Sequence, residues 1–391
     1  MVALLTLRRK VLAALGAFAA LAVLSACDVN MSGGGGGPIL NNTRAVPVAL
    51  LIPKSSPNGA AVAQSLENAA RLAVQDLGDR VDIDLKVYDT AGTPAGAAAA
   101  ARQALDDGAQ IFLGPLFAEA ANAAGQVAAS RGINVLSFSN NATIAGGNVY
   151  ILGTTFQNTA DRLVSHAARQ GKGSIFVVHA QDPAEVQGAD AIRRAASASG
   201  ARIAGVASFP LSQQGVIDTI PSIASQYRSS GANSVFLTSG NSGALPFLAE
   251  LLPENGMDAA SAQLIGLQRL DVPSSALSLK GLQGAWFATP SPALVQQFNS
   301  RYAAAYGSQP NPVAGLAYDG LAAIGALLAQ GRSDALTGSA LTQGAGFAGV
   351  YGPFRFLGDG TNERGLAVAQ IQNNQVIVID PAPRSFGGAG F

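Results

Sequence analysis

Short apolar segments alternate with longer helical segments from Val46 onward, and this alternation limits the fold more than any other feature of the chain. The runs VPVALLIP (46–53) and IDLKVYD (83–89) have the apolar character of buried strands. Asn58 stands where its side chain can cap the start of a helix between them. In that helix, apolar residues recur every three or four positions, as on one buried face: Val62, Leu66, Ala69, Ala73 and Leu77.

The same unit repeats along most of the chain. A helix is expected from Pro94 to a stop at Gly108. Strands alternating with helices form parallel sheets covered on both faces. A single open sheet with so many strands would be unusually large. We therefore predict an α/β fold of two lobes, each a mainly parallel sheet with helices on both faces. Further strands are expected at 109–114, 133–138, 174–179, 201–209, 233–240 and 262–267, and helices at 117–132, about 184–199, about 217–230 and 243–252.

The end of the chain has a different pattern. The segments VYGPFRF (350–356), GLAVAQIQ (365–372) and QVIVID (375–380) follow one another as strands, with no helix between them. Short turn-rich segments join them, LGDGTNER and NN. This pattern predicts an antiparallel addition at the edge of a sheet.

The N-terminus has the layout of a secretory signal peptide. Arg8, Arg9 and Lys10 precede an apolar run at 11–23 that is too short to span a bilayer comfortably, and small residues follow. Leu24-Ser25-Ala26-Cys27 also looks like a bacterial lipobox, which implies cleavage before Cys27 and lipid attachment to it. A plain signal peptide and an uncleaved anchor helix are the alternatives. The expected segments are a signal peptide at 1–26 and a lipidated, glycine-rich tether at 27–45.

Asp28 bears on which membrane would hold such a lipoprotein. An aspartate directly after the cysteine resembles the signal that keeps lipoproteins of some bacteria in the inner membrane. The expected location is the periplasmic face of a bacterial membrane, with the inner membrane favoured. A lipid anchor is the expected contact with that membrane, since the mature chain has no stretch that reads as a transmembrane helix.

Composition excludes several classes of function. Charged residues make up 12% of the chain and the formal net charge is zero, so nothing attracts nucleic acid. Cys27 is the only cysteine, which leaves no disulfide framework and no thiolate metal site. His166 and His179 are the only histidines and have no partner at metal-ligand spacing, so we expect them in packing or at the surface.

Catalytic motifs are missing as well. The chain has no G-x-S-x-G elbow, no phosphate loop ending in G-K-S/T and no H-E-x-x-H. GAGFAG (344–349) matches G-x-G-x-x-G but precedes a strand, so a glycine-rich turn explains it better than a dinucleotide site. Trp286 is expected in the core. We expect a non-catalytic protein with no cofactor and no metal.

Loops after the predicted strands are the expected ligand site, because ligands of open α/β sheets bind at the carboxyl ends of the strands. These loops are rich in hydroxyl and amide side chains, which suit a small polar or anionic molecule. The alternative for each residue is an ordinary turn or capping role. For Asp319, on a predicted helix, a structural hydrogen bond is the alternative. The candidate ligand-binding residues are Ser55, Ser56, Asn58, Leu116, Phe117, Ser139, Asn140, Asn141, Thr143, Asp182, Asn241, Gln268 and Asp319.

Long stretches of the chain resemble the type I periplasmic binding proteins of the leucine-binding-like group. The opening VPVALLIPKSSPNGAAVAQSLENAARLAVQDL, the segment LKVYDTAGTPAGAAAAARQALDDGAQIFLGPLF and the closing GPFRFLGDGTNERGLAVAQIQ carry the likeness, which runs from about Val46 to Asp380. It implies two lobes joined by three crossovers that close on a ligand. Lobe one would hold 46–155 and 289–343, lobe two 156–288 and 344–383, with a tail at 384–391.

The likeness also implies where an amino-acid ligand would be held. In amino-acid-binding members a serine follows the GP turn, where this chain has Leu116 and Phe117, and an acid for the ligand ammonium falls near Gln268. A buried ligand needs both of its charges matched. Asp182, Glu185 or Asp271 is the expected replacement for that acid, and the 139–143 loop can take the carboxylate.

Two functions follow from these resemblances. The first is a receptor that delivers an amino acid or similar small polar solute to the permease of an ABC importer. The second comes from the penicillin-binding protein activators, lipoproteins with this fold that stimulate a peptidoglycan synthase through protein contacts. LGPLFAEAANAA, NVLSFSNN and YILGTTFQNTADRLVSHA are similar to their corresponding stretches. An activator of this kind would need no ligand.

Overall fold

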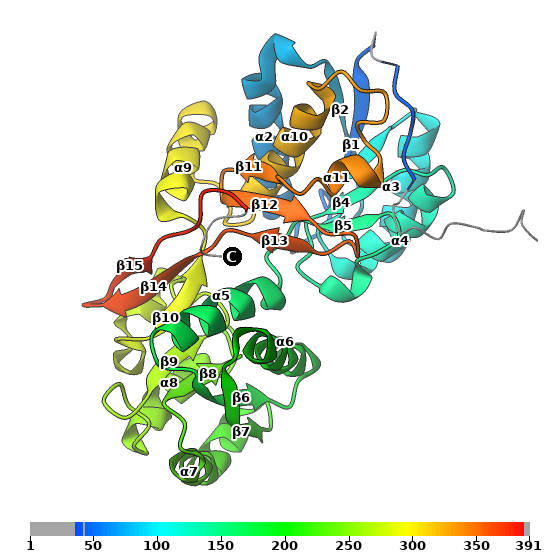
Figure 1. Cartoon of the computed structure of the whole chain (residues 1–391). Helices are drawn as coiled ribbons and strands as arrows, with labels where there is room; N and C mark the ends of the chain where they lie inside the picture. Colours follow the sequence, from blue (N-terminus) through cyan, green and yellow to red (C-terminus); the bar gives the residue numbers. More distant parts are fainter. Residues whose placement is uncertain (1–35, 42–43, 387–391) are drawn as a thin grey trace, which may run out of the picture. The chain divides into compact units, whose positions relative to one another are not determined.

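A computed structural model describes residues 36–41 and 44–386 of the chain (Figure 1). The predicted signal peptide, Cys27 and the last residues of the predicted tail lie outside the described residues. A five-stranded parallel sheet comes first, with strand order β2-β1-β3-β4-β5. Its strands are β1 (Val46–Ile52), β2 (Ile83–Asp89), β3 (Ile111–Leu113), β4 (Val135–Ser137) and β5 (Val149–Ile151).

A seven-stranded sheet follows, in the order β15-β14-β10-β9-β8-β6-β7. Of the last two strands, β14 pairs antiparallel with β10 and β15 pairs antiparallel with β14, which confirms the antiparallel edge predicted for 365–380. Asn373 and Asn374 both have positive φ in the two-residue turn between them, as the tightest hairpins require. The strands are β6 (Ser174–Ala180), β7 (Arg202–Phe209), β8 (Ser234–Leu237), β9 (Gln263–Gly266), β10 (Trp286–Thr289), β14 (Ala367–Gln372) and β15 (Gln375–Asp380).

Helices cover both faces of each sheet because alternate side chains of the strands point to opposite faces. In β1, Val48, Leu50 and Ile52 pack with one set of helices, whereas Ala49 and Leu51 pack with the other. The set on the first face is α2 (Ala60–Leu77), α9 (Pro292–Tyr306) and α10 (Gly315–Leu328), and the set on the second is α3 (Pro94–Asp106) and α4 (Ala118–Ala129).

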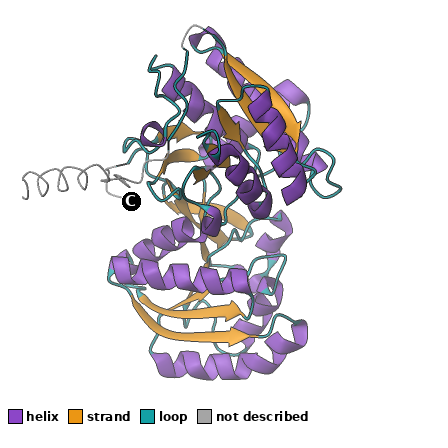
Figure 2. Cartoon of the chain, turned by 90° about the vertical axis from the view of Figure 1, so that its right-hand side faces the viewer, coloured by secondary structure: helices purple, strands orange, loops and turns teal. Residues whose placement is uncertain are grey.

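The seven-stranded sheet is covered in the same way, and Figure 2 shows its strands between helices on either side. Phe176 and Val178 of β6 face one set of helices, while Ile175 and Val177 face the other. The first set is α7 (Gln213–Ser230) and α8 (Leu245–Glu254), and the second is α5 (Phe156–Arg169) and α6 (Pro183–Ser199). The predicted α/β fold with helices on both faces of mainly parallel sheets is therefore confirmed.

A small third sheet differs from the prediction. The segment 350–356 does not extend a large sheet but pairs within the antiparallel sheet β11-β12-β13. Alternate buried residues of this sheet, Phe347, Phe354 and Phe356, join the hydrophobic cluster of α2, α10 and β1. The contacts of 347–356 are therefore with the part of the chain predicted as lobe one. The strands are β11 (Phe347–Gly349), β12 (Gly352–Phe356) and β13 (Asn362–Arg364), and the short helices are α11 (Gly338–Leu341), η2 (Gly78–Arg80), η3 (Ala142–Ile144), η4 (Ser274–Ser278) and η5 (Lys280–Leu282).

Some local predictions were wrong. Asn58 does not cap α2, because Gly59 occupies the cap position and no side chain bonds there. The helix expected from about 217 begins at Gln213, after a cap by Ser212. Among the described residues, no helix is both long enough and apolar enough to cross a membrane.

Candidate functional site

The strand orders define where a ligand crevice would open at each sheet. In the five-stranded sheet the chain order reverses between β1 and β3, and in the seven-stranded sheet it reverses between β6 and β8. Helices that leave neighbouring strands at such a point pass to opposite faces, which opens space at the carboxyl ends. The helices α2 and α4 begin after β1 and β3, and no side chain caps either of them. The first N–H of α2, that of Ala60, bonds the carbonyl of Ser56, whereas the next N–H groups of α2 and the first ones of α4 can bind a ligand oxygen.

Three loops of the five-stranded sheet meet at these strand ends. A Cβ added to Gly92 would lie 2.9 Å from the Ser56 hydroxyl oxygen and 3.2 Å from the ring of Phe117. The Phe117 side chain is 40% exposed although it is large and apolar. Leu116, by contrast, packs against the hydrophobic cluster of β1 and α2. The structure thus brings Ser56 and Phe117 together at the β1 and β3 ends.

Asp89 organises the loop that follows β2. Its Oδ1 accepts the backbone N–H groups of Ser55 at 3.2 Å and Ala91 at 2.8 Å. Burial alone would raise the pKa of Asp89, but the hydrogen bonds from Ser55, Ala91 and Lys54 lower it below its ordinary value. Ser55 therefore has a structural hydrogen bond here, while Asn58 is exposed.

The loop after β4 is bonded internally. The buried Ser139 accepts the N–H of Asn141 on its hydroxyl oxygen at 3.1 Å. Asn141 Oδ1 in turn accepts the N–H of Thr143 at 3.0 Å and its hydroxyl at 2.8 Å, which caps η3. Asn140 lies exposed between them. The geometry supports the capping interpretation for Asn141 and leaves the Thr143 and Asn140 side chains at the surface.

In the seven-stranded sheet, Glu185 occupies the point where the chain order reverses. This residue lies in the first turn of α6 and is only 8% exposed. Its Oε2 accepts the N–H of Ala180 at 2.6 Å and the hydroxyl of Thr238 at 2.9 Å. The Ser239 hydroxyl lies 2.9 Å from Oε1 and 2.8 Å from Oε2. Glu185 therefore connects the carboxyl ends of β6 and β8.

The amides of Gln268 and Asn241 lie in the neighbouring loops. Gln268 donates from Nε2 to the carbonyl of Thr238 at 2.8 Å, and its Oε1 lies against Gly240. Asn241 donates from Nδ2 to the carbonyls of Arg269 at 3.3 Å and Val272 at 2.8 Å. The buried Asn241 Oδ1 has no hydrogen-bond partner within the described part of the chain. Both side chains are thus held in place by backbone carbonyls of the strand-end loops.

The other candidate acids have structural partners. Asp182 caps α6 by accepting the N–H groups of Ala184 at 2.9 Å and Glu185 at 3.3 Å. Asp271 forms a bidentate pair with Arg269 at 2.5 and 2.6 Å. Asp319 is fully buried and pairs with Arg364 at 3.0 Å. Burial raises the pKa of Asp319, and Arg364 opposes that rise.

The histidines have the structural surroundings that the sequence suggested. His166 is buried, lies 2.9 Å from Asp380 Oδ2 through Nδ1, and packs edge-on against Trp286 with ring centroids 4.9 Å apart. His179 donates from Nδ1 to the carbonyl of Ala180 at 2.8 Å. No group of three or more potential metal ligands exists among residues 36–41 and 44–386.

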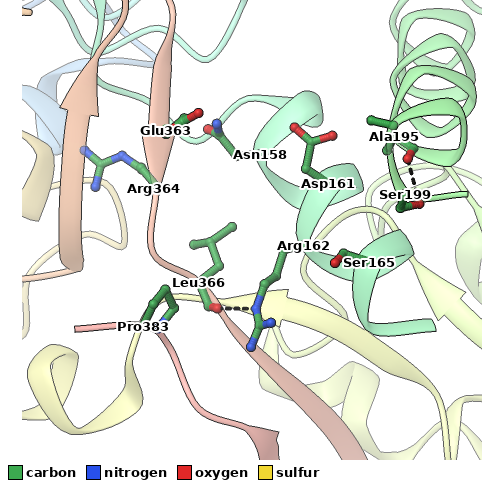
Figure 3. A pocket seen from close by; sticks show the side chains of 11 residues that line it. Asn158, Asp161, Arg162, Ser165, Ala195, Ser199, Glu363, Arg364, Leu366 and Pro383 are labelled. Atoms are coloured by element: carbon green, nitrogen blue, oxygen red, sulfur yellow. Dashed lines mark hydrogen bonds between the residues drawn. The ribbon is translucent and has the colours of Figure 1, made fainter. Parts of the chain in front are cut away.

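One cavity was not anticipated from the sequence. It has a volume of about 290 Å³ and contains none of the predicted ligand-binding residues. Figure 3 shows Asp161 and Glu363 on different segments of its wall, together with Arg162, which donates to the carbonyl of Leu366. Burial raises the pKa of Asp161, and the charge of Glu363 raises it further. The position of the cavity depends on packing between α5, α6 and 363–366, and no local sequence motif encodes that packing.

Comparison with known proteins assigns the family. Residues 45–375 match the family model described as "Periplasmic binding protein", so the chain belongs to this family. The predicted resemblance to type I periplasmic binding proteins is thereby confirmed. None of the curated proteins matches the chain significantly.

Several solved structures are similar to this chain. A branched chain amino acid ABC transporter periplasmic ligand-binding protein from Burkholderia xenovorans LB400 has a TM-score of 0.70 and 19% identity, covering 88% of this chain and 97% of its own. An ABC transporter substrate-binding protein from Desulfitobacterium hafniense, in complex with Leu, has a TM-score of 0.64 and 17% identity, covering 86% and 100%. A solute-binding protein from Rhodopseudomonas palustris BisB5, in complex with 3,4-dihydroxybenzoic acid, has a TM-score of 0.61 and 17% identity, covering 86% and 96%. At these identities the likeness establishes the fold alone.

Proposed function

We propose that this protein is the solute-binding component of an ABC importer and that its ligand is an amino acid or a similar small solute with a carboxylate. Family membership supports this function. Similar structures bind leucine or 3,4-dihydroxybenzoic acid, and both ligands carry a carboxylate. The permease of the importer is then the expected protein partner, and the protein itself performs no chemistry on the solute.

The observation that carries the proposal is the supply of donors where β1 and β3 end. The N-termini of α2 and α4 lack side-chain caps, whereas Thr93, Thr155 and Asp182 cap α3, α5 and α6. Uncapped N–H groups at a helix start favour an anion. The Ser56 hydroxyl lies beside them, and the exposed Phe117 ring offers an apolar contact. Together they suit a carboxylate attached to an apolar body.

The proposed location is the periplasmic face of a bacterial membrane. Lipid attached to Cys27 would hold the protein there, and the following 27–45 segment would act as the tether. Asp28 favours the inner membrane, where the permease is also located. We expect a Cys27→Ser variant to lose its association with the membrane, which cell fractionation measures. Unchanged association would contradict lipid anchoring at this residue.

A ligand screen tests the proposed function. We expect at least one amino acid or small carboxylate to raise the melting temperature, because a ligand that binds only the folded state stabilises it. Calorimetry with that ligand should then give one site per chain. If a broad panel produces no shift and the protein instead co-purifies with a peptidoglycan synthase, the importer function is wrong.

One observation favours the alternative function, activation of a peptidoglycan synthase. The polar groups of Asn141, Asp182 and Asp271 are satisfied by the protein itself, so they do not require a ligand. A protein that acts through surface contacts alone would have such satisfied loops. The comparisons give this alternative no support, and it remains the second candidate.

A further inference from the structure

Glu185 differs from Asp271 and Asp319 because it is buried and yet forms no ion pair among the described residues. None of the ion pairs among the described residues includes Glu185, although its side chain is buried. All of its contacts come from neutral donors, one backbone N–H and two hydroxyls. Buried carboxylates are normally paired with a positive charge, because desolvation of an unpaired charge is costly.

Three other candidate acids are engaged by structural partners. Asp182 spends one carboxylate oxygen on the first N–H groups of α6. Both oxygens of Asp271 are engaged by the guanidinium of Arg269. Asp319 is inaccessible and already neutralised by Arg364. Asp182 also forms no ion pair, but it is only half-buried, so Glu185 is the one of these acids that is both buried and without an ion pair among the described residues.

Hydroxyls and glycines form the loop next to Glu185. The Thr238 and Ser239 hydroxyls already donate to the carboxylate. Gly243 follows in the same loop, close to Glu185 Oε1: a Cβ on Gly243 would lie 3.9 Å from it. The hydrogen bonds that these hydroxyls can donate are therefore made, and a ligand that brings its own N–H groups suits the remaining acceptor capacity of the carboxylate.

We propose that Glu185 binds a primary ammonium group of the ligand, and that it determines specificity for amino acids over plain carboxylic acids. This inference rests on the proposed solute-binding function. Val186, which follows Glu185 and is 38% exposed, provides an apolar contact for the ligand side chain. The acid expected near Gln268 is thus replaced by one from the first turn of α6.

Three related solutes test the inference: leucine, 4-methylpentanoate, which lacks the amine, and 3-methylbutylamine, which lacks the carboxylate. We expect the wild-type protein to bind leucine at least about tenfold more tightly than 4-methylpentanoate, which is the effect of one charged hydrogen bond. In Glu185→Gln, this preference should disappear, while the affinity for 4-methylpentanoate stays unchanged. Glu185→Asp should keep part of the preference, because the charge remains.

A matched control separates recognition from structure. Glu250 lies exposed in α8, so Glu250→Gln removes an acid on a helix of the same sheet without removing a buried contact. We expect this variant to keep the preference for leucine. Equal binding of leucine and 4-methylpentanoate by the wild-type protein would overturn the inference, and this comparison needs no variant. A preference that survives Glu185→Gln would overturn it as well.

The same titrations separate the inference from the proposed function. Binding of 4-methylpentanoate without any preference for the amine overturns the role of Glu185 and leaves a solute-binding protein. The protein could also bind none of the three solutes but bind a solute without an amine from a broader panel. That result would likewise overturn the role of Glu185 and leave a solute-binding protein. If no solute in the panel binds, the proposed function is wrong and the inference is overturned with it.

Discussion

Glu185 and Asp319 are both buried acids, but their surroundings differ in charge. Asp319 in α10 pairs with Arg364 from β13 and also accepts the N–H of Val350 at 2.6 Å. Glu185 in α6 has three neutral donor groups and no cation among the described residues. At Asp319, which is fully buried, the chain supplies the counter-charge. The uncompensated acid lies instead at the strand ends, where a ligand can supply that charge.

Asp380 extends the comparison. Its Oδ2 lies 3.0 Å from Arg162, 2.9 Å from His166 and 2.9 Å from Arg169, so one carboxylate has three basic partners. These contacts attach the end of β15 to α5. Asp380 is therefore surrounded by positive groups although it is only partly buried, whereas the more deeply buried Glu185 has neutral donors alone.

The largest effect on stability is expected from Asp319→Asn. The substitution leaves Arg364 buried without a counter-charge, and such a loss typically costs about 3–5 kcal/mol of unfolding free energy. Urea denaturation measures this loss of unfolding free energy. Glu185→Gln should cost only about 1 kcal/mol, because its donors are neutral and an amide oxygen can still accept. Equal losses for the two variants would remove the distinction between a structural acid and a ligand-binding acid.

The Asp380 cluster predicts a dependence of stability on pH. Burial is the largest influence on His166 and lowers its pKa; Asp380 opposes this, and the charges of Arg162 and Arg169 add to the lowering. The unfolded chain therefore takes up a proton at higher pH than the folded protein does. The free energy of unfolding should fall as the pH drops from about 7 through the ordinary histidine value near 6.5 and below it.

The His166→Asn variant provides the control for this pH dependence. Its amide can still donate to Asp380, but it does not titrate. Denaturation curves at pH 7.5 and pH 5.5 should show a smaller loss of stability for the variant than for the wild-type protein. An equal loss in both proteins would assign the pH dependence to other groups.

A third prediction concerns the acid next to Glu185. Asp182→Ala removes the cap of α6, which should cost about 1 kcal/mol of unfolding free energy. The preference for leucine over 4-methylpentanoate should remain, because Asp182 faces backbone N–H groups. The matched control is Asp190→Ala on the same helix, where only an exposed pair with Arg193 is lost. If Asp182→Ala abolishes the preference, the two acids have been assigned the wrong roles.

The smallest effect on stability is expected in the 139–143 loop. Asn141→Ala combined with Thr143→Ala removes mutual hydrogen bonds at the surface, so the free energy of unfolding should change by about 0.5 kcal/mol or less. Calorimetry should show weaker ligand binding if this loop takes part in the site. Unchanged affinity would exclude the loop from the site.

The sequence predicted the regular part of the fold well because periodicity is a local signal. Strand β1 and helix α3 lie where their apolar pattern and their Pro94 and Gly108 boundaries place them. The three-residue strand β5 was missed, although β3 and β4, which are equally short, were predicted from the longer apolar runs that contain them. Likewise, Phe354 and Phe356 alternate as in any strand, so their sequence cannot reveal that they pack on α2 and α10.

The candidate site was less predictable because its character depends on contacts between distant residues. Composition marked the strand-end loops as polar but could not separate ligand groups from caps. Asp182 and Glu185 are three residues apart, yet only the contact of Glu185 with Thr238 and Ser239, more than fifty positions away, separates their roles. The pairing of Asp319 with Arg364 likewise joins residues 45 positions apart.

A crystal structure of the protein with leucine, or with the amine-bearing solute that most raises the melting temperature, tests the role of Glu185 most directly. We expect the ligand nitrogen within about 3 Å of a Glu185 carboxylate oxygen, as in a charged hydrogen bond. A ligand nitrogen placed against another acid, with Glu185 still bonded only to Ala180, Thr238 and Ser239, would contradict this account.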